Sequence, residues 1–261
     1  MYISNYIVDN EKNLCELFKN IDSIFIENGL TVHSDRNTTK KIEFNGRFFA
    51  VKSFQSPNML QRLAYANFKK PKAQRSLEFS EKLIEAGLHS PKPIGYIVKI
   101  KRIQVYQSYY ISEFHEFEHD LVPVFKDFNT HLELVEQFIK TVARMHDFNI
   151  YHHDLTKRNV LINPAEEQVF SFIDNNRISF NRMSLKMRME SISKLTNNIA
   201  ELHTLAKLYS KYSIYSPDSC IHFIEKGFEK SQLYKKIKNL LKGNKKGAFD
   251  VTPFFTRGKL R

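Results

Sequence analysis

The sequence predicts an α+β fold in two lobes: a small β-rich lobe with one helix, followed by a mainly α-helical lobe. Asn-Gly pairs separate short β-rich runs in the first part of the chain, and one helical stretch interrupts these runs. Beyond residue 112, apolar residues instead recur at helical spacing over long segments. We therefore expect the N-terminal lobe at residues 1–112 and the C-terminal lobe at residues 113–261.

Turn residues divide the N-terminal lobe into short strands. Asn28-Gly29 and Asn45-Gly46 each lie between two β-rich runs, and each pair predicts a hairpin because both central residues of such a turn need positive φ. A helix is expected from Lys72 to Ala86, with Gly87 placed to end it. The predicted strands are residues 24–26, 31–33, 41–44, 47–52, 94–98 and 103–111.

The C-terminal lobe is expected to be helical around one short hairpin. Two β-like runs, 160–162 and 169–173, lie on either side of Asn163-Pro164. The last helix is predicted in two pieces, because the step from Phe228 to Leu233 breaks its apolar stripe. The predicted helices are residues 132–148, 195–212 and 221–241.

One segment combines the residue types that phosphoryl transfer requires. His152, Asp154 and Asn159 follow the pattern H-x-D-x-x-x-x-N, and Asp174 ends the second β-like run. A loop aspartate can accept the proton of an acceptor hydroxyl, while an asparagine and a second aspartate can hold Mg²⁺ against phosphate oxygens. The pattern also requires an upstream lysine on a strand, and Lys52 supplies it.

Such a lysine needs a carboxylate from the following helix to hold it in place. Glu78 is the first choice on the predicted helix, and Glu81, one turn later, is the alternative. The pairing of Lys52 with one of these two residues is therefore expected.

These motifs, in this order, resemble the protein-kinase-like superfamily and, more narrowly, the lipopolysaccharide kinases of the Kdo/WaaP type. The resemblance covers roughly residues 24 to 180, where the last motif, Asp174-Asn175-Asn176-Arg177, replaces the Asp-Phe-Gly of protein kinases. The other segments that carry it are residues 49–54, 87–95 and 153–161.

The resemblance implies a two-lobed protein-kinase-like fold with ATP and Mg²⁺ bound between the lobes. Lys52 is then expected to bind phosphates, Glu78 to orient Lys52, and Asp154 to act as catalytic base. The implied Mg²⁺ ligands are Asn159 and Asp174. His152 is expected to brace the catalytic loop, and Glu113 with Phe114 to form the hinge that offers backbone groups to adenine.

The chain also departs from the protein-kinase pattern. No G-x-G-x-x-G precedes Lys52, so the loop over the phosphates is expected within residues 31–40. Thr156 occupies a position where many protein kinases have lysine, and no Ala-Pro-Glu follows Asp174. The leading hypothesis is a kinase that phosphorylates a sugar hydroxyl, of Kdo or heptose, in the lipopolysaccharide core. An atypical protein kinase of the RIO type, a small-molecule phosphotransferase and a pseudokinase scaffold are the alternatives.

Charge and composition bear on location and partners. The net charge is +12, and residues 221–261 hold eleven lysines and arginines against three acidic residues. This basic region is interpreted either as the solvated side of a helix or as a surface attracted to an anionic membrane or an acidic substrate. The low cysteine count, with no long apolar run and no secretory signal, favours a cytoplasmic location, with peripheral contact to the inner membrane. Nucleic acid is not expected as a partner.

The segment from His115 to His119 matches the zinc-protease pattern H-E-x-x-H. On a helix its two histidines would share one face and could bind zinc, with Glu116 as the base. A chance match is the preferred interpretation, because the chain has ten histidines and a helix here would be short before Pro123.

Overall fold

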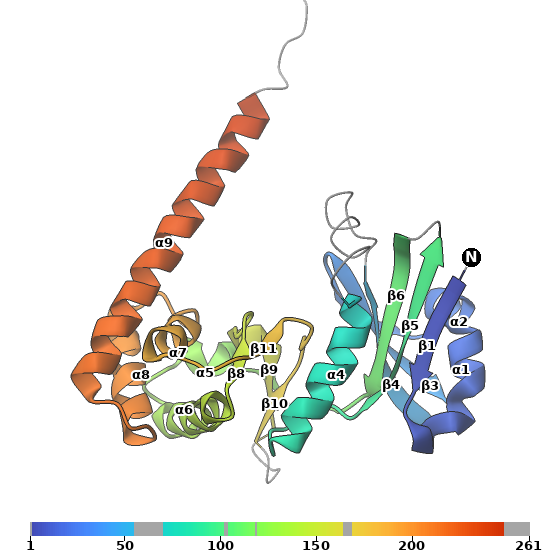
Figure 1. Cartoon of the computed structure of the whole chain (residues 1–261), viewed down its shortest axis with the longest axis horizontal. Helices are drawn as coiled ribbons and strands as arrows, with labels where there is room; N and C mark the ends of the chain where they lie inside the picture. The colour runs from blue at the N-terminus through green and yellow to red at the C-terminus, as the bar shows by residue number, and fades with distance from the viewer. Residues whose placement is uncertain (1, 55–69, 102–103, 118, 164–168, 248–261) are drawn as a thin grey trace, which may run out of the picture.

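The computed structural model describes residues 2–54, 70–101, 104–117, 119–163 and 169–247, in which a strand-rich part lies beside a helical part (Figure 1). The strand-rich part contains an antiparallel six-stranded sheet in the order β1-β5-β6-β4-β3-β2. This arrangement confirms the predicted α+β fold class. The strands are β1 (Tyr2–Ile7), β2 (Leu30–Ser34), β3 (Asn37–Phe44), β4 (Arg47–Phe54), β5 (Pro93–Lys101) and β6 (Gln104–Glu113).

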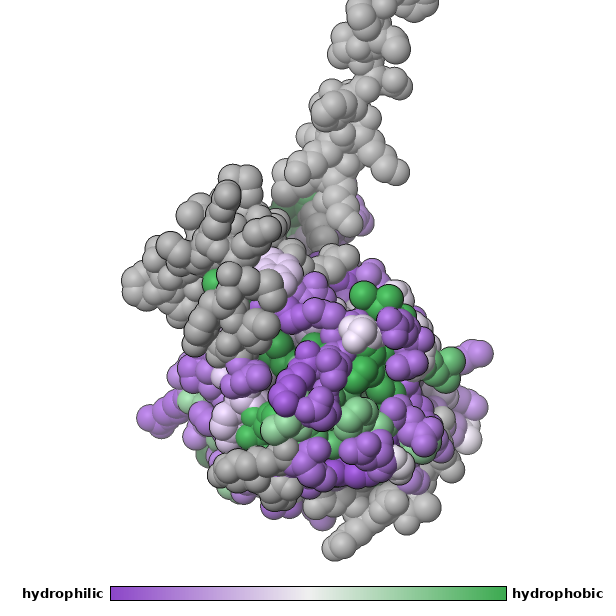
Figure 2. All heavy atoms as spheres, turned by 90° about the vertical axis from the view of Figure 1, so that its right-hand side faces the viewer, coloured by the Kyte–Doolittle hydropathy of each residue, from purple (hydrophilic) through white to green (hydrophobic). Residues whose placement is uncertain are grey.

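Helices lie on both faces of this sheet (Figure 1). On one face, a short 3₁₀ segment η1 (Asp9–Leu14) leads into α1 (Cys15–Lys19) and α2 (Ile21–Glu27). On the other face lies α4 (Lys72–Glu85), which follows the predicted helix closely and ends before Gly87, with a φ of 69°. Figure 2 shows the outer side of the strand-rich part, where hydrophobic residues lie in separate areas between hydrophilic ones.

The structure corrects the first of the two predicted hairpins. Residues 24–26, predicted as a strand, belong to helix α2, whose Ile21 is buried while Ile24 and Phe25 pack partly against the same core. Their spacing of three and four residues makes a helical stripe, and packing of that stripe onto the sheet overrides the local β-propensity. Asn28 and Gly29, with φ of 91° at the glycine, end this helix instead of forming a hairpin turn.

The second predicted hairpin is confirmed. Asn45 and Gly46 both have positive φ, 51° and 72°, and join β3 to β4. Along β4, Phe49 and Val51 are buried in the core beneath α1 and α2. Because successive strand residues point to opposite faces, Lys52 is directed to the side of the sheet that α4 covers.

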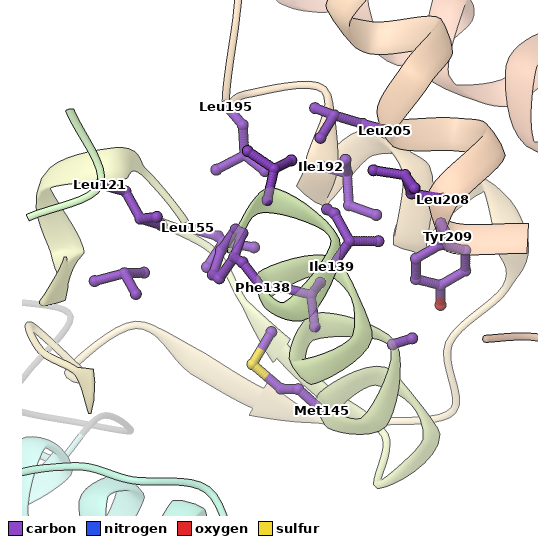
Figure 3. Packing of buried hydrophobic residues seen from close by; sticks show 14 of the residues in the cluster. Leu121, Phe138, Ile139, Met145, Leu155, Ile192, Leu195, Leu205, Leu208 and Tyr209 are labelled. Atoms are coloured by element: carbon purple, nitrogen blue, oxygen red, sulfur yellow. The ribbon is translucent and has the colours of Figure 1, made fainter. Parts of the chain in front are cut away.

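The helical part is built around α6 (Leu132–Asp147). Figure 3 shows Phe138 and Ile139 of α6 packed among Ile192, Leu205 and Tyr209, all of which are almost fully buried. The other helices are α5 (Val122–Lys126), α7 (Leu185–Ile192), α8 (Ile199–Lys211) and α9 (Pro217–Gly247). The short strands are β7 (His119–Asp120), β8 (Ile150–His152), β9 (Val160–Ile162), β10 (Phe170–Phe172) and β11 (Ile178–Phe180).

Helix α9 is continuous, which corrects the predicted division into two pieces. Its first half packs against α7 and α8 through buried Cys220 and Ile224. Hydrogen bonds to Glu190 and Asn197 continue the contact as far as Lys235, and beyond it the helix extends away from the rest of the molecule (Figure 1). Because these contacts after Phe228 are made by polar side chains, they need no apolar stripe, and the break in the stripe does not interrupt the helix. Within the described ranges, no helix has the length and apolar character needed to cross a membrane.

Candidate active site

The loop that carries the H-x-D-x-x-x-x-N pattern connects two small antiparallel sheets, β8 with β11 and β9 with β7 and β10. His152 ends β8 and pairs with Ile178 of β11, while a 3₁₀ turn, η2 (Lys157–Asn159), leads into β9. Asn159 ties the loop together, because its Nδ2 donates to the Asp154 carbonyl oxygen at 2.8 Å and its own carbonyl accepts from the Ile173 amide at 3.0 Å. The five-residue spacing of the motif thus brings Asn159 back onto the backbone of Asp154.

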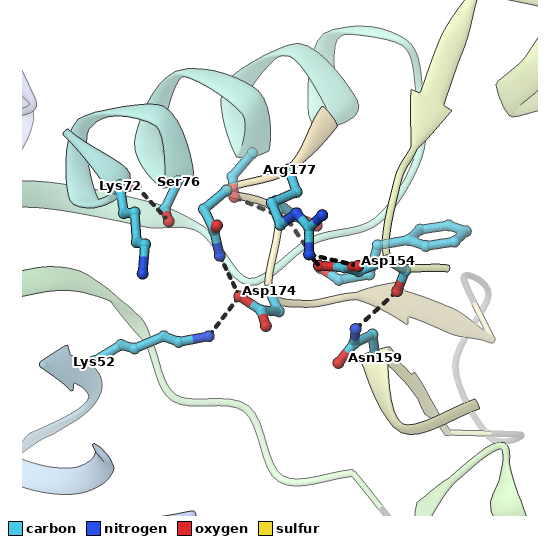
Figure 4. Close-up of polar contacts among 11 residues, drawn as sticks. Lys52, Lys72, Ser76, Asp154, Asn159, Asp174 and Arg177 are labelled. Atoms are coloured by element: carbon cyan, nitrogen blue, oxygen red, sulfur yellow. Dashed lines mark hydrogen bonds and ion pairs between the residues drawn. The ribbon is translucent and has the colours of Figure 1, made fainter. Parts of the chain in front are cut away.

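Lys52 and Asp174 meet across the junction of the two parts of the molecule (Figure 4). The Nζ atom of Lys52 lies 2.6 Å from Oδ1 of Asp174, and both side chains are mostly buried. The Asn176 side chain donates to the same carboxylate oxygen. Asp174 has a φ of 59°, a left-handed conformation that is uncommon outside glycine and is concentrated at functional sites.

Figure 4 shows that the structure brings Lys52, Asp154, Asn159 and Asp174 into one region, although 122 residues separate the lysine from Asp174. Asp154 is held by Arg177, whose Nη1 donates to both carboxylate oxygens at 3.0 and 2.8 Å. Sequence reasoning assigned no role to Arg177, although it lies in the motif after Asp174.

His152 is fully buried, and burial is the main reason that its pKa falls to about 4. Its imidazole is therefore neutral near pH 7, which suits a supporting role rather than proton transfer. The neighbouring side chain of Asn175 is also buried, and its Nδ2 donates to Ser80 at 3.0 Å and Ser90 at 2.9 Å. Asn175 thereby connects the site to α4 and to the segment before β5, a role that the sequence did not reveal.

Lys194 approaches the catalytic loop from the segment after α7. Its Nζ donates to the His153 carbonyl oxygen at 2.9 Å and lies 3.4 Å from the Tyr151 hydroxyl. Burial lowers the pKa of Lys194, and the negative charge of Asp154 acts in the opposite direction. No local pattern in the sequence distinguishes this lysine, because about 40 residues separate it from the loop that it contacts.

The predicted Lys52–Glu78 pair is corrected by the structure. The Glu78 carboxylate accepts from Lys70 at 2.7 and 2.9 Å and from Gln74 at 3.0 Å, while Lys52 binds Asp174. The reason is the helical rotation of about 100° per residue. Buried Ser76 and Ser80 lie on the inner side of α4, and Glu78, two residues from each, faces the other way.

The alternative partner, Glu81, also makes no ion pair with Lys52 among the described contacts. Burial raises the pKa of Glu81, and the negative charges of Glu85 and Glu78 raise it further.

The predicted hinge lies at the end of β6, but its amides are engaged. The Glu113 amide donates to the Lys92 carbonyl oxygen and the Phe114 amide to that of Phe48, each at 2.9 Å. The Glu113 carboxylate accepts from Arg47 at 2.8 Å. Both amides are therefore used within the strand-rich part, and the role of this pair as the hinge that offers backbone groups to adenine stays a prediction.

The segment expected to cover the phosphates, residues 31–40, forms the β2–β3 hairpin. Ser34 pairs with Thr38, and Thr39 of β3 lies directly beside Lys52 of β4. Arg36 lies in the tight turn of this hairpin. The hairpin thus places Thr39 beside Lys52 and has an arginine rather than a glycine in its turn, and its role as the loop over the phosphates stays a prediction.

The H-E-x-x-H match is not a helix. Residues 114–117 have no regular structure, residue 118 lies outside the described residues, and His119 belongs to strand β7. Across the described part of the chain, no group of three or more histidine, cysteine, aspartate or glutamate side chains could hold a metal ion. The two histidines therefore do not share a helix face as the zinc interpretation requires.

A strand-rich part and a helical part with these residues at their junction define the protein-kinase-like fold. A solved structure described as WaaP in complex with acyl carrier protein superposes with a TM-score of 0.58, covering 88% of this chain and 99% of that one at 16% identity. The profile of the Lipopolysaccharide kinase (Kdo/WaaP) family matches residues 38–211, about two thirds of the chain. The chain belongs to this family, as the motifs predicted.

Curated relatives agree with this assignment. A 3-deoxy-D-manno-octulosonic acid kinase of Mannheimia succiniciproducens is 31% identical over 101 residues, which are 39% of this chain and 42% of that protein. One of Haemophilus influenzae (strain 86-028NP) is 30% identical over 89 residues, 34% of this chain and 37% of the relative. The matched stretch thus spans less than half the length of each of these relatives.

Proposed function

We propose that the protein is an ATP- and Mg²⁺-dependent kinase that phosphorylates a sugar hydroxyl of the lipopolysaccharide core, with Kdo as the first candidate acceptor and heptose as the second. The observation that carries this proposal is the convergence of Lys52, Asp154, Asn159 and Asp174 on one site. The family and the kinase relatives named for 3-deoxy-D-manno-octulosonic acid support the choice of acceptor.

The reaction follows from the roles of the side chains. Asp154 accepts the proton of the acceptor hydroxyl as its oxygen forms a bond to the γ-phosphorus, and the bond to the bridging oxygen breaks so that ADP leaves. Lys52 binds the phosphates by charge. Asn159 and Asp174 offer the oxygen donors that Mg²⁺ prefers, and the ion would neutralise phosphate charge.

The experiment offers labelled ATP to the protein with three acceptors: Kdo-containing lipid A, a protein mixture and free sugars. Label on the Kdo-containing lipid, absent with Asp154→Asn, is the expected result. Transfer to protein or to free sugar alone contradicts the proposed acceptor. A rise in melting temperature with Mg-ATP but no transfer to any acceptor identifies a pseudokinase instead.

We further propose that the protein works at the cytoplasmic face of the inner membrane and that α9 contacts this surface. Leu233, Tyr234 and Ile237 are exposed on the extended half of α9, beside the exposed Lys236. Exposed apolar side chains next to cations favour an anionic lipid surface. Sedimentation with phosphatidylglycerol vesicles tests this: binding should weaken in Leu233→Gln/Ile237→Gln and in high salt, and equal binding to neutral vesicles contradicts it.

A further inference from the structure

A second lysine, Lys72, projects from the start of α4 into the space around Lys52 and Asp174 (Figure 4). The Nζ atoms of Lys52 and Lys72 lie 5.5 and 5.9 Å from the centre of the same Phe54 ring. Lys52 binds Asp174, whereas the ammonium group of Lys72 makes no hydrogen bond or ion pair with the residues that the structure describes. The ammonium groups of Lys52 and Lys72 therefore both lie near the Asp174 carboxylate, which binds that of Lys52.

Further positive charge surrounds Lys72. Burial lowers its pKa, and the charges of Arg75, Lys52 and Arg36 lower it further, whereas Asp174 raises it. Arg75 lies one turn along α4, and Arg36 comes from the turn of the β2–β3 hairpin. Like charges gathered at a partly buried site repel one another, so this arrangement is stabilised by an added anion.

The neighbouring carboxylates do not supply this anion. Glu78 is turned outward and bound by Lys70, and Asp174 is shared between Lys52 and Asn176. The hairpin that lies over the site contains no glycine between Thr31 and Lys40, so it offers no glycine-rich run of amides to phosphates. Among the described residues around Asp174, the cationic side chains are therefore the groups placed to bind phosphate.

We propose that Lys72 is a second triphosphate-binding lysine, which together with Lys52 and Arg36 holds the β- and γ-phosphates of the nucleotide in place of a glycine-rich loop. The inference rests on the proposed function, because it assigns the phosphate contacts of the same site.

The test compares Lys72→Gln, Lys72→Arg and the matched control Lys70→Gln, which removes the same charge two residues away on the outer side. Titration calorimetry measures the dissociation constants of Mg-ATP and AMP for each. Lys72→Gln should weaken Mg-ATP binding by about 10-fold or more and leave AMP unchanged, since AMP lacks the contacted phosphates. Lys72→Arg should restore most of the affinity, and Lys70→Gln should match the unmodified protein.

A second measurement needs no substitution. Treatment of the unmodified protein with an amine-acylating reagent, followed by mass spectrometry, should show that Mg-ATP protects Lys72 and that adenosine does not. Unchanged Mg-ATP affinity in Lys72→Gln, or equal acylation of Lys72 with and without Mg-ATP, overturns the inference and leaves the proposed kinase activity standing. ATP binding that depends on Lys72 without transfer to any sugar refutes the proposed function and leaves the inference standing.

Discussion

Arg177 binds both carboxylate oxygens of Asp154 from a single nitrogen, at 3.0 and 2.8 Å. The arginine comes from the segment after Asp174, three residues beyond the carboxylate that Lys52 contacts. One short segment therefore controls two carboxylates of the site: it supplies Asp174 directly and it positions Asp154 through Arg177. This arrangement makes Arg177 a positioning residue of the proposed reaction.

Arg177→Ala should lower kcat by about 10- to 100-fold, because a base displaced by about 1 Å loses much of its effect. The affinity for Mg-ATP should stay unchanged, since Arg177 faces Asp154 rather than Lys52. Steady-state kinetics and calorimetry measure the two quantities. Arg182→Ala, at an exposed position nearby, is the matched control. Equal kcat in Arg177→Ala and the control would refute the positioning role.

Asp154→Asn and Asp174→Asn should both abolish transfer, but for different reasons. The first removes the proposed proton acceptor and should cost roughly 10²- to 10⁴-fold in kcat while Mg-ATP still binds. The second removes a proposed Mg²⁺ ligand and should weaken the dependence of ATP binding on Mg²⁺. Transfer assays and titrations with and without Mg²⁺ separate the two effects, and circular dichroism checks that both variants fold. Full activity in both variants would exclude the assigned roles.

The free energy of unfolding should fall as the pH drops from about 6.5 to about 4. Burial lowers the pKa of His146 to about 3 and that of His152 to about 4 in the folded protein. The unfolded chain binds protons at these histidines below pH 6.5 while the folded protein does not, so acid favours unfolding in this window. The slope reaches about 1.4 kcal/mol per pH unit for each histidine.

Urea denaturation of the unmodified protein and of His146→Asn between pH 7 and pH 4.5 measures this effect. The variant loses the contact of His146 with the Tyr209 hydroxyl and should be less stable at pH 7. Its stability should nevertheless depend less on pH, because one of the two buried histidines is gone. If the free energy of unfolding of His146→Asn changed with pH as steeply as that of the unmodified protein, His146 would not contribute to the pH dependence of stability.

Two glycine substitutions should destabilise the strand-rich part for different reasons. A Cβ at Gly95 would collide with the Tyr6 carbonyl oxygen and the Phe18 ring, so Gly95→Ala should cost about 1–3 kcal/mol or more. A Cβ at Gly46 meets nothing within 4 Å, and its φ of 72° adds only the backbone strain of about 1 kcal/mol. Thermal unfolding measures the stability of both variants. A larger loss of stability in Gly46→Ala than in Gly95→Ala would contradict the close packing around Gly95 in β5.

Several features of the molecule could be predicted because their signals lie within a few residues of one another. The turn at Asn45-Gly46 needs only positive φ at two positions, and helix α6 follows from the apolar stripe along residues 132–147. The close approach of Asn159 to Asp154 is similar, since the two residues are only five positions apart in the chain. In each case, interactions within a few residues were sufficient to predict the feature.

Other features depended on which surfaces meet in three dimensions. Residues 24–26 became helical because Ile24 and Phe25 pack against the core of the sheet, and β1 exists because it pairs with β5, about 90 residues away. Glu78 lies on the outer side of α4, so Lys52 binds Asp174 instead. The sequence pattern identifies the residues that can carry the chemistry. Which partners these residues contact depends on helix rotation and strand pairing, because the contacts join segments that are far apart in the chain.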